Sequence, residues 1–118
     1  MRRRYKGREM AKTALNPQNL ESVATRFRIL GVPLRLQILN ELAGGERTVG
    51  ELVDATGSTQ PNVSKHLTTL LSHRLVKREK RGNSAYYTVA DPAVFKLCEI
   101  VCGNIERALD EELRAFSG

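Results

Sequence analysis

Apolar residues recur every three or four positions in the first half of the chain, which is the spacing of amphipathic helices. A first helix is predicted from Pro17, with Asn16 as its cap. A second is predicted to begin at Pro33 and to end at the glycines 44 and 45. Arg35 lies near the start of this second helix, where the helix dipole disfavours a cation, so we expect it to form an ion pair, with a phosphate contact as the alternative. The apolar positions of the two helices are Leu20, Val23, Phe27, Leu30, Leu34, Ile38, Leu39 and Leu42.

Two shorter helical patterns follow, separated by a glycine. The first stops at Thr56 and Gly57, where glycine can adopt the left-handed backbone angles that a helix end requires. The second begins near Gln60, after Thr59 as N-cap and with Pro61 in its first turn. Their apolar positions are Val49, Leu52, Val53, Val63, Leu67, Leu70 and Leu71. Two short helices joined by a tight turn predict a helix-turn-helix.

The second helix of this pair has polar side chains opposite its apolar stripe. Hydrogen-bonding side chains at the start of an exposed helix suit the major groove of DNA, where base edges lie between phosphates. An ordinary surface helix is the alternative, because any amphipathic helix has a polar face. His66 lies on the flank of the stripe, and no cysteine stands near it or His73, which favours DNA or packing contacts over a zinc site. The residues predicted to contact DNA are Gln60, Asn62, Ser64, Lys65 and His66.

A basic hairpin, the wing, is predicted over residues 76–90. Two runs of strand-forming residues flank Gly82 and Asn83, a dipeptide that favours a tight turn. The first run carries four cations against the single acid Glu79. The side chains predicted to contact phosphate or the minor groove are Lys77, Arg78, Lys80 and Arg81, and Tyr86 is predicted to support the wing. A helix-turn-helix followed by a basic hairpin predicts a winged helix.

Three segments, LGVPLRLQILNEL, TQPNVSKHLTTLL and YYTV, resemble the ArsR/SmtB family of small bacterial winged-helix repressors. The resemblance extends from about Leu20 to the C-terminus. It implies a mostly helical winged helix-turn-helix with a small β-hairpin, in the order α-α-α-α-β-β-α, that binds DNA and dimerises through its terminal helices. Val32 and Leu34 stand where the family pattern has small or polar residues, and these departures concern core packing.

The chain ends in a long amphipathic helix, predicted from Pro92 to about Phe116 with Asp91 as its cap. The apolar residues of this helix form one stripe along its length, the C-terminal apolar stripe: Phe95, Cys98, Cys102, Ile105, Leu109, Leu113 and Phe116. So long a stripe is more apolar surface than one small domain covers, which predicts a homodimer. Two-fold symmetry then places two DNA-contacting helices about one turn of duplex apart and predicts a near-palindromic operator.

Both cysteines of the chain belong to this stripe and lie four positions apart. The β-carbons of such a pair are about 5 to 6 Å apart, farther than the roughly 3.5 to 4.5 Å that a disulfide prefers. Thiolates bind thiophilic ions, and the ArsR/SmtB family contains sensors of arsenite, antimonite, zinc, cadmium and lead, and of thiol oxidation. We therefore expect an effector, above all arsenite, to bind Cys98 and Cys102 and to release the DNA.

This effector site departs from the family's usual ones. Residues 49–55 lack the cysteine pair of many arsenic and cadmium sensors, and the last helix lacks the Asp and His ligands of the zinc sensors. Two thiolates are also one short of a three-sulfur site. Two alternatives remain: the cysteines serve as small apolar packing residues, or they form a redox or persulfide switch.

Composition and charge restrict the class of protein. A chain of 118 residues, 41% hydrophobic and 27% charged, predicts one globular domain at residues 16–118 behind a basic, disordered arm at residues 1–15. The net charge of +6 is concentrated before the last helix, which favours DNA as a partner. No apolar run approaches the roughly 18 residues of a membrane span, so we expect a cytoplasmic protein. No enzyme motif is present; the alternative to a repressor is a winged-helix protein-docking module.

Overall fold

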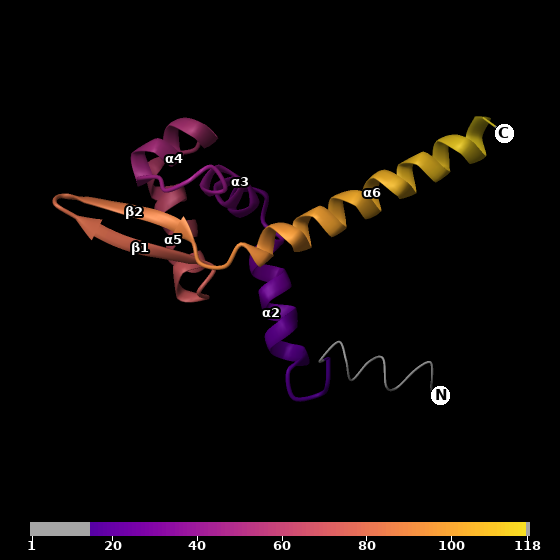
Figure 1. Cartoon of the computed structure of the whole chain (residues 1–118), viewed down its shortest axis with the longest axis horizontal. Helices are drawn as coiled ribbons and strands as arrows, with labels where there is room; N and C mark the ends of the chain where they lie inside the picture. The colour runs from indigo at the N-terminus through magenta and orange to yellow at the C-terminus, as the bar shows by residue number, and fades with distance from the viewer. Residues whose placement is uncertain (1–14, 118) are drawn as a thin grey trace.

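The computed structural model describes residues 15–117, and the predicted arm at residues 1–15 lies almost wholly outside them. The described elements are α2 (Leu20–Leu30), α3 (Pro33–Leu42), α4 (Val49–Thr56), α5 (Gln60–Ser72), β1 (Val76–Arg81), β2 (Ser84–Val89) and α6 (Ala93–Ser117). This order is the one predicted for a winged helix-turn-helix. The three helices α3, α4 and α5 gather beside the hairpin, whereas α2 and α6 project from this body in different directions (Figure 1).

Local hydrogen bonds and a glycine define the ends of the two helices of the helix-turn-helix. At the start of α4, the Thr48 hydroxyl accepts a hydrogen bond from the Glu51 amide at 3.2 Å, and the Glu51 carboxylate accepts one from the Thr48 amide at 2.8 Å. This reciprocal capping box satisfies two amides that have no partner within the helix. Gly57 ends α4 with a φ of 74°, and the Thr59 hydroxyl accepts from the Asn62 amide at the start of α5. The predicted turn is therefore confirmed.

Helix α2 begins three residues later than predicted. Residues 17–19 form a turn, and α2 starts at Leu20 instead of Pro17. The Asn16 side chain still acts as a cap, but for this turn, because its Oδ1 accepts from the amides of Gln18 and Asn19 at 3.0 and 3.1 Å. A capping residue followed by a proline can therefore begin a turn that leads into a helix, and not only the helix itself.

The hydrophobic core lies where α3, α4 and α5 meet the hairpin. Ile38, Leu52, Val63 and Leu70 have no exposed surface, so each of the three helices contributes its apolar face. The other buried hydrophobic residues are Leu30, Leu39, Leu42, Leu67, Leu75, Val76 and Tyr87. This core holds α5 by one face and leaves the opposite face accessible.

The wing is an antiparallel hairpin in which Val76 pairs with Val89 and Arg81 with Ser84. Gly82 opens the two-residue turn with a φ of 61°, an angle that glycine adopts without strain. One feature of the sheet was not predicted. Arg47, between α3 and α4, pairs with Tyr87 through two backbone hydrogen bonds of 3.1 and 2.8 Å. The base of the wing is thereby attached to the chain segment that enters the helix-turn-helix.

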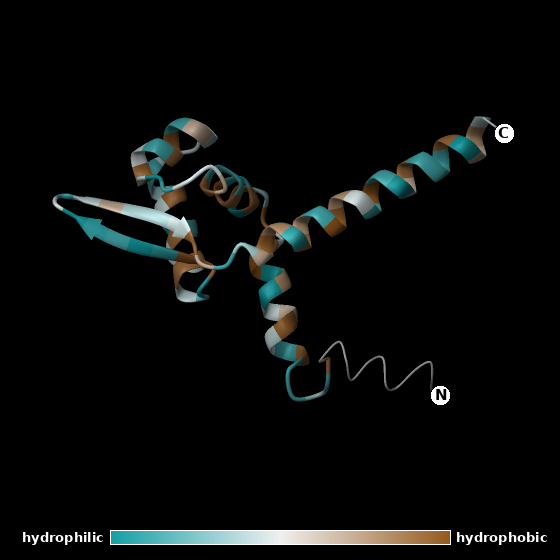
Figure 2. Ribbon diagram, in the orientation of Figure 1, coloured by the Kyte–Doolittle hydropathy of each residue, from teal (hydrophilic) through white to brown (hydrophobic). Residues whose placement is uncertain are grey.

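Helix α6 is the longest element and none of its 25 residues is buried. It begins at Ala93, whose amide donates to the Asp91 side chain at 2.9 Å, so the predicted cap is confirmed and the predicted start is one residue early. Hydrophobic and hydrophilic segments alternate along it (Figure 2). Within residues 15–117, no helix combines the length and apolarity needed to cross a bilayer.

Candidate nucleic-acid interface and cysteine groove

The polar face of α5 is accessible where the sequence predicts DNA contacts. Gln60, Asn62 and Lys65 are exposed and Ser64 is half-buried. The Asn62 side chain donates to the Ser58 hydroxyl at 3.3 Å, a contact that orients the amide at the start of the helix. Four of the five helix residues predicted to contact DNA therefore lie on an accessible surface.

His66 differs from the other four, because only 9% of its surface is exposed. Its Nδ1 accepts a hydrogen bond from Arg35 Nε at 3.0 Å, and Arg35 Nη1 donates to the Ile29 carbonyl at 3.1 Å. Burial lowers the pKa of His66 below its ordinary 6.5, and the charges of Arg35 and Lys65 lower it further. The ring is thus neutral, with its proton on Nε2, and belongs to the interior of the fold.

Two predictions are corrected by this contact. His66 does not lie on the polar face of α5, and we remove it from the DNA-contacting set. Arg35 forms hydrogen bonds to a histidine and a carbonyl, so the expected ion pair with an acid is wrong for the described residues. The helical spacing contained the signal: His66 stands three residues after Val63 and four before Leu70, both of which are fully buried.

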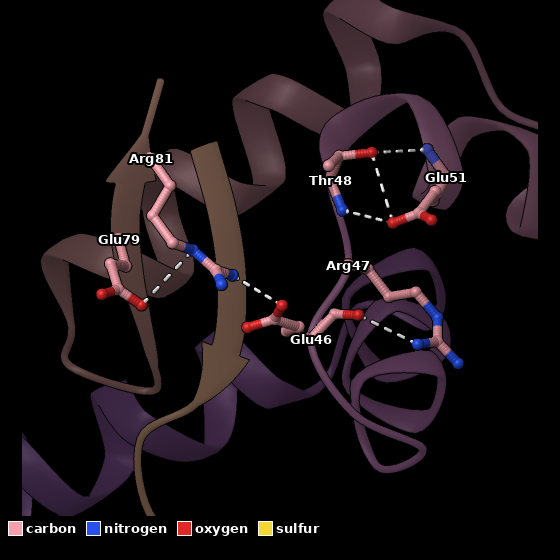
Figure 3. A network of polar contacts seen from close by, with 6 residues as sticks. All are labelled: Glu46, Arg47, Thr48, Glu51, Glu79 and Arg81. Atoms are coloured by element: carbon pink, nitrogen blue, oxygen red, sulfur yellow. Dashed lines mark hydrogen bonds and ion pairs between the residues drawn. The ribbon is translucent and has the colours of Figure 1, made fainter. Parts of the chain in front are cut away.

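The wing presents its cations to solvent, since every residue of β1 after Val76 is exposed. Arg81 is anchored more firmly than the others. Its guanidinium pairs with Glu46 and lies 3.8 Å from the Glu79 carboxylate (Figure 3). The guanidinium also stacks 4.0 Å from the centre of the Tyr86 ring. The hydrogen bond to Glu46 raises the pKa of Arg81. Tyr86 therefore contacts a cation of the wing. This cation, Arg81, is one of the four predicted to bind phosphate, and it is paired with Glu46 of the body.

A groove lies between α2, α3 and α6 and contains both cysteines. Its volume is about 380 Å³, and Cys98 is half-buried in it whereas Cys102 is exposed. Apart from the two sulfurs, its side chains are hydrocarbon. The residues that line this cysteine groove are Phe27, Leu30, Gly31, Leu36, Leu97, Cys98, Val101, Cys102 and Ile105. Among residues 15–117, no cluster of three or more His, Cys, Asp or Glu side chains could hold a metal ion.

Comparisons with known proteins agree with this architecture. A family model described as "Bacterial regulatory protein, arsR family" matches residues 32–78. The "Probable mercury resistance operon repressor" of Streptomyces lividans is 39% identical over 77 residues, which are 65% of this chain and 62% of that protein. This chain therefore spans about three fifths of that relative's length. The regulator NmtR of Mycobacterium tuberculosis is 33% identical over 93 residues, 79% of this chain and 78% of NmtR.

Solved structures share the fold. The homodimeric winged helix-turn-helix DNA-binding domain of Mb0332 from Mycobacterium bovis is 35% identical, with a TM-score of 0.68 over 78% of this chain and 85% of that one. The antimony-specific transcriptional repressor AntR is 29% identical, with a TM-score of 0.70 over 80% of this chain and 86% of AntR. The sequence match to NmtR and the shared winged helix lead to one conclusion: this chain belongs to the arsR family of bacterial regulatory proteins.

Proposed function

We propose that this protein is a cytoplasmic transcriptional repressor that binds a near-palindromic operator as a homodimer and releases it when a thiophilic ion binds Cys98 and Cys102. The first part of this proposal, DNA binding, is supported by one observation: the accessible polar face of α5 lies beside a cationic hairpin. The apolar stripe of α5 is buried in the core, so its polar face is the one left to contact a partner.

Within this proposal the two surfaces have different roles. Gln60, Asn62 and Ser64 contact base edges, because amides and hydroxyls can donate and accept hydrogen bonds there. The cations of the wing contact phosphates, which position the protein without selecting a sequence. The residues proposed for phosphate contacts are Lys65, Lys77, Arg78, Lys80 and Arg81.

Exposed apolar side chains on α2 and α6 support the homodimer. Phe27 on α2 is 54% exposed, and Ile105 and Leu109 on α6 are 53% and 54% exposed. Contiguous apolar surface of this kind marks protein interfaces. The homodimeric state of the Mb0332 domain, which has the same fold, adds to this argument.

The second part of the proposal, release of DNA by a thiophilic ion, is supported by the position of the cysteines. One similar protein is named a probable mercury resistance operon repressor and another an antimony-specific transcriptional repressor. Mercury and antimony are thiophilic elements, and thiolates are the ligands that such elements prefer. Arsenite is the specific effector we propose. The cysteine groove includes Leu36 of α3, and the preceding residue, Arg35, donates a hydrogen bond to His66 of α5. A ligand that binds the groove better in the DNA-free arrangement shifts the protein toward that arrangement, and α3 connects the groove to the DNA-contacting helix.

The test is a DNA mobility shift with the protein's own upstream region, with and without arsenite, zinc and a thiol oxidant. We expect a shifted duplex that arsenite releases, and no release from a Cys98→Ser/Cys102→Ser protein that still binds the duplex. Affinity for the operator should exceed that for random duplex by about 10³-fold or more and should fall steeply with salt. Weak, sequence-independent binding would contradict the repressor and favour a protein-docking module. Release by the oxidant alone would replace arsenite by a redox signal.

A further inference from the structure

We propose that Asn62 recognises one adenine in each half of the operator, and that Ser58 is the positioning residue that orients the Asn62 amide for this contact. This inference rests on the proposed function, because it names the base that one residue of the same DNA-contacting surface selects. Three features of the molecule support it: the hydrogen bonds that fix the turn between α4 and α5, the contact of Asn62 with that turn, and the polar groups that this contact leaves for a base.

The turn before α5 is connected to the hydrophobic core by side-chain hydrogen bonds. The Thr56 hydroxyl donates to the carbonyl of Leu52 at 2.7 Å and accepts from the Ser58 amide at 3.3 Å. Leu52 has no exposed surface, and Ser58 is itself half-buried. The backbone of Ser58 is therefore held by the core, which restricts where its hydroxyl can lie relative to α5.

Asn62 uses part of its side-chain amide to contact this turn. One N–H of Nδ2 donates to the Ser58 hydroxyl oxygen at 3.3 Å, and the backbone N–H of Asn62 donates to the Thr59 hydroxyl, also at 3.3 Å. A primary amide has two N–H donors and one carbonyl oxygen. Within residues 15–117 no further hydrogen bond engages this side chain, so its oxygen and its second N–H are available at an exposed position. Asn62 lies in the first turn of α5, and the N-terminal residues of a DNA-contacting helix are the ones that reach base edges.

The groups left on Asn62 match adenine better than any other base. In the major groove adenine presents the N7 acceptor beside the N6 amino donor, so one amide can accept from N6 and donate to N7. Guanine presents two acceptors, one of which would face the amide oxygen, and cytosine and thymine each offer only one of the two hydrogen bonds. The opposite orientation of the amide, with its oxygen on Ser58, would leave only N–H donors and would favour guanine. The hydrogen bond from Nδ2 to Ser58 therefore points to adenine.

The contact with Ser58 strengthens this selectivity. The terminal torsion of an asparagine side chain is broad, and a half-turn about it exchanges the oxygen with the nitrogen. An amide that a hydroxyl already holds loses less conformational freedom when it binds a base. Without the Ser58 hydroxyl, Asn62 could present either its oxygen or its two N–H donors to the groove, and it would distinguish adenine from guanine less well.

The experiment selects duplexes from a random-sequence library with the full-length protein and with Asn62→Ala, and sequences the bound fractions. The wild-type protein should select an inverted repeat with adenine at one position of each half. Asn62→Ala should lose the preference at that position and retain it at the others. Discrimination by the wild type against the other three bases there should be about fivefold or more, as one bidentate contact to a base provides.

An adenine analogue and variants of Ser58 test the contact itself by fluorescence anisotropy. 7-Deazaadenine at that position, which lacks the N7 acceptor, should weaken binding by the wild type and leave binding by Asn62→Ala unchanged. Ser58→Ala should bring the affinities for adenine and guanine toward equality at this position alone, whereas Ser58→Thr, which keeps the hydroxyl, should retain the preference. Ser72→Ala is the matched control, because it removes a hydroxyl from the far end of α5, where Ser72 donates to the Thr69 carbonyl at 3.0 Å, and it should change no preference.

The outcomes separate this inference from the proposed function. Selection of guanine, cytosine or thymine at the position that Asn62→Ala loses overturns the inference and leaves the proposed function intact, and so does an unchanged selection by Asn62→Ala. An undiminished preference for adenine in Ser58→Ala overturns the positioning role of Ser58. Failure of the wild-type protein to select any sequence overturns the DNA-binding part of the proposed function as well.

Discussion

The hydrogen bond from Arg35 to His66 joins three helices through two side chains. Arg35 is on α3, its second donor reaches the carbonyl of Ile29 on α2, and His66 is on α5. A buried polar group needs such a partner, because a lost hydrogen bond in the interior costs about 1 to 3 kcal/mol. The arginine supplies only donors, so His66 must present a lone pair and remain neutral. The position of α5, the helix proposed to contact DNA, therefore depends on the protonation of one ring.

This dependence predicts how stability changes with pH. The pKa of folded His66 is lowered from 6.5, so below that pH the unfolded chain binds a proton that the folded chain resists. The free energy of unfolding should be level above pH 6.5 and should fall as the pH decreases toward the lowered pKa. Urea unfolding followed by circular dichroism between pH 5.5 and 7.5 measures it. His66→Asn should flatten this fall, since the amide cannot titrate and its oxygen can accept from Arg35, whereas His73→Asn should retain it. The same fall in His66→Asn would show that another group is responsible.

Residues whose roles are local could be assigned from the sequence, and those with roles set by tertiary contacts could not. Thr48, Gly57 and Thr59 act within four residues of their own positions, so helix ends near them follow from the chain alone. Arg35 and His66 are 31 positions apart. A polar residue beside an apolar stripe is equally compatible with an exposed or a buried side chain until the neighbouring helix is placed.

At the scale of elements, two polar contacts attach the wing to the body in addition to the core packing of Val76 and Tyr87. The backbone pair of Arg47 and Tyr87 holds its base, and the ion pair of Glu46 with Arg81 reaches nearly to its tip (Figure 3). The bounds of both strands were predictable from strand-forming residues around a turn dipeptide. The attachment was not, because a single bridging residue such as Arg47 has no periodicity that could reveal it.

The ion pair leads to a prediction about DNA binding. Glu46→Gln should release Arg81 to a phosphate, so that the operator is bound more tightly at low salt and the slope of log K against log salt steepens by about one. Fluorescence anisotropy over a range of salt concentrations measures both quantities. Glu99→Gln, which makes the same charge change on α6, is the control and should leave the slope as in the wild type. An unchanged slope in Glu46→Gln would mean that Arg81 does not reach DNA.

At the scale of the whole molecule, α6 has more apolar surface than its own chain covers. Leu113 and Phe116 near its end are 67% and 93% exposed, although the elements α3 to α5 have a closed core. This exposed apolar surface of α6 was predictable from the sequence, because a long apolar stripe is a local pattern. The sequence could not predict the cysteine groove, which exists only because α2, α3 and α6 converge on one space.

Leu109 tests whether this surface is the dimer interface. It is 54% exposed on the C-terminal apolar stripe, and a charge placed there would have to leave water when two copies pair. Leu109→Glu should weaken self-association at least about 100-fold, or about 2.7 kcal/mol, and should yield single chains at micromolar concentration in sedimentation velocity.

Arg107→Glu is the matched control, because position 107 lies about 200° around the helix from position 105 of the stripe, and it should remain dimeric although it also gains an acid. The monomeric variant should bind a full operator no more tightly than a half-site, since the second DNA-contacting helix is no longer tethered to the first. A Leu109→Glu protein that sediments as a dimer would show that the interface lies elsewhere on the molecule. The distance between the two α5 helices, on which a near-palindromic operator depends, would then differ from the one proposed.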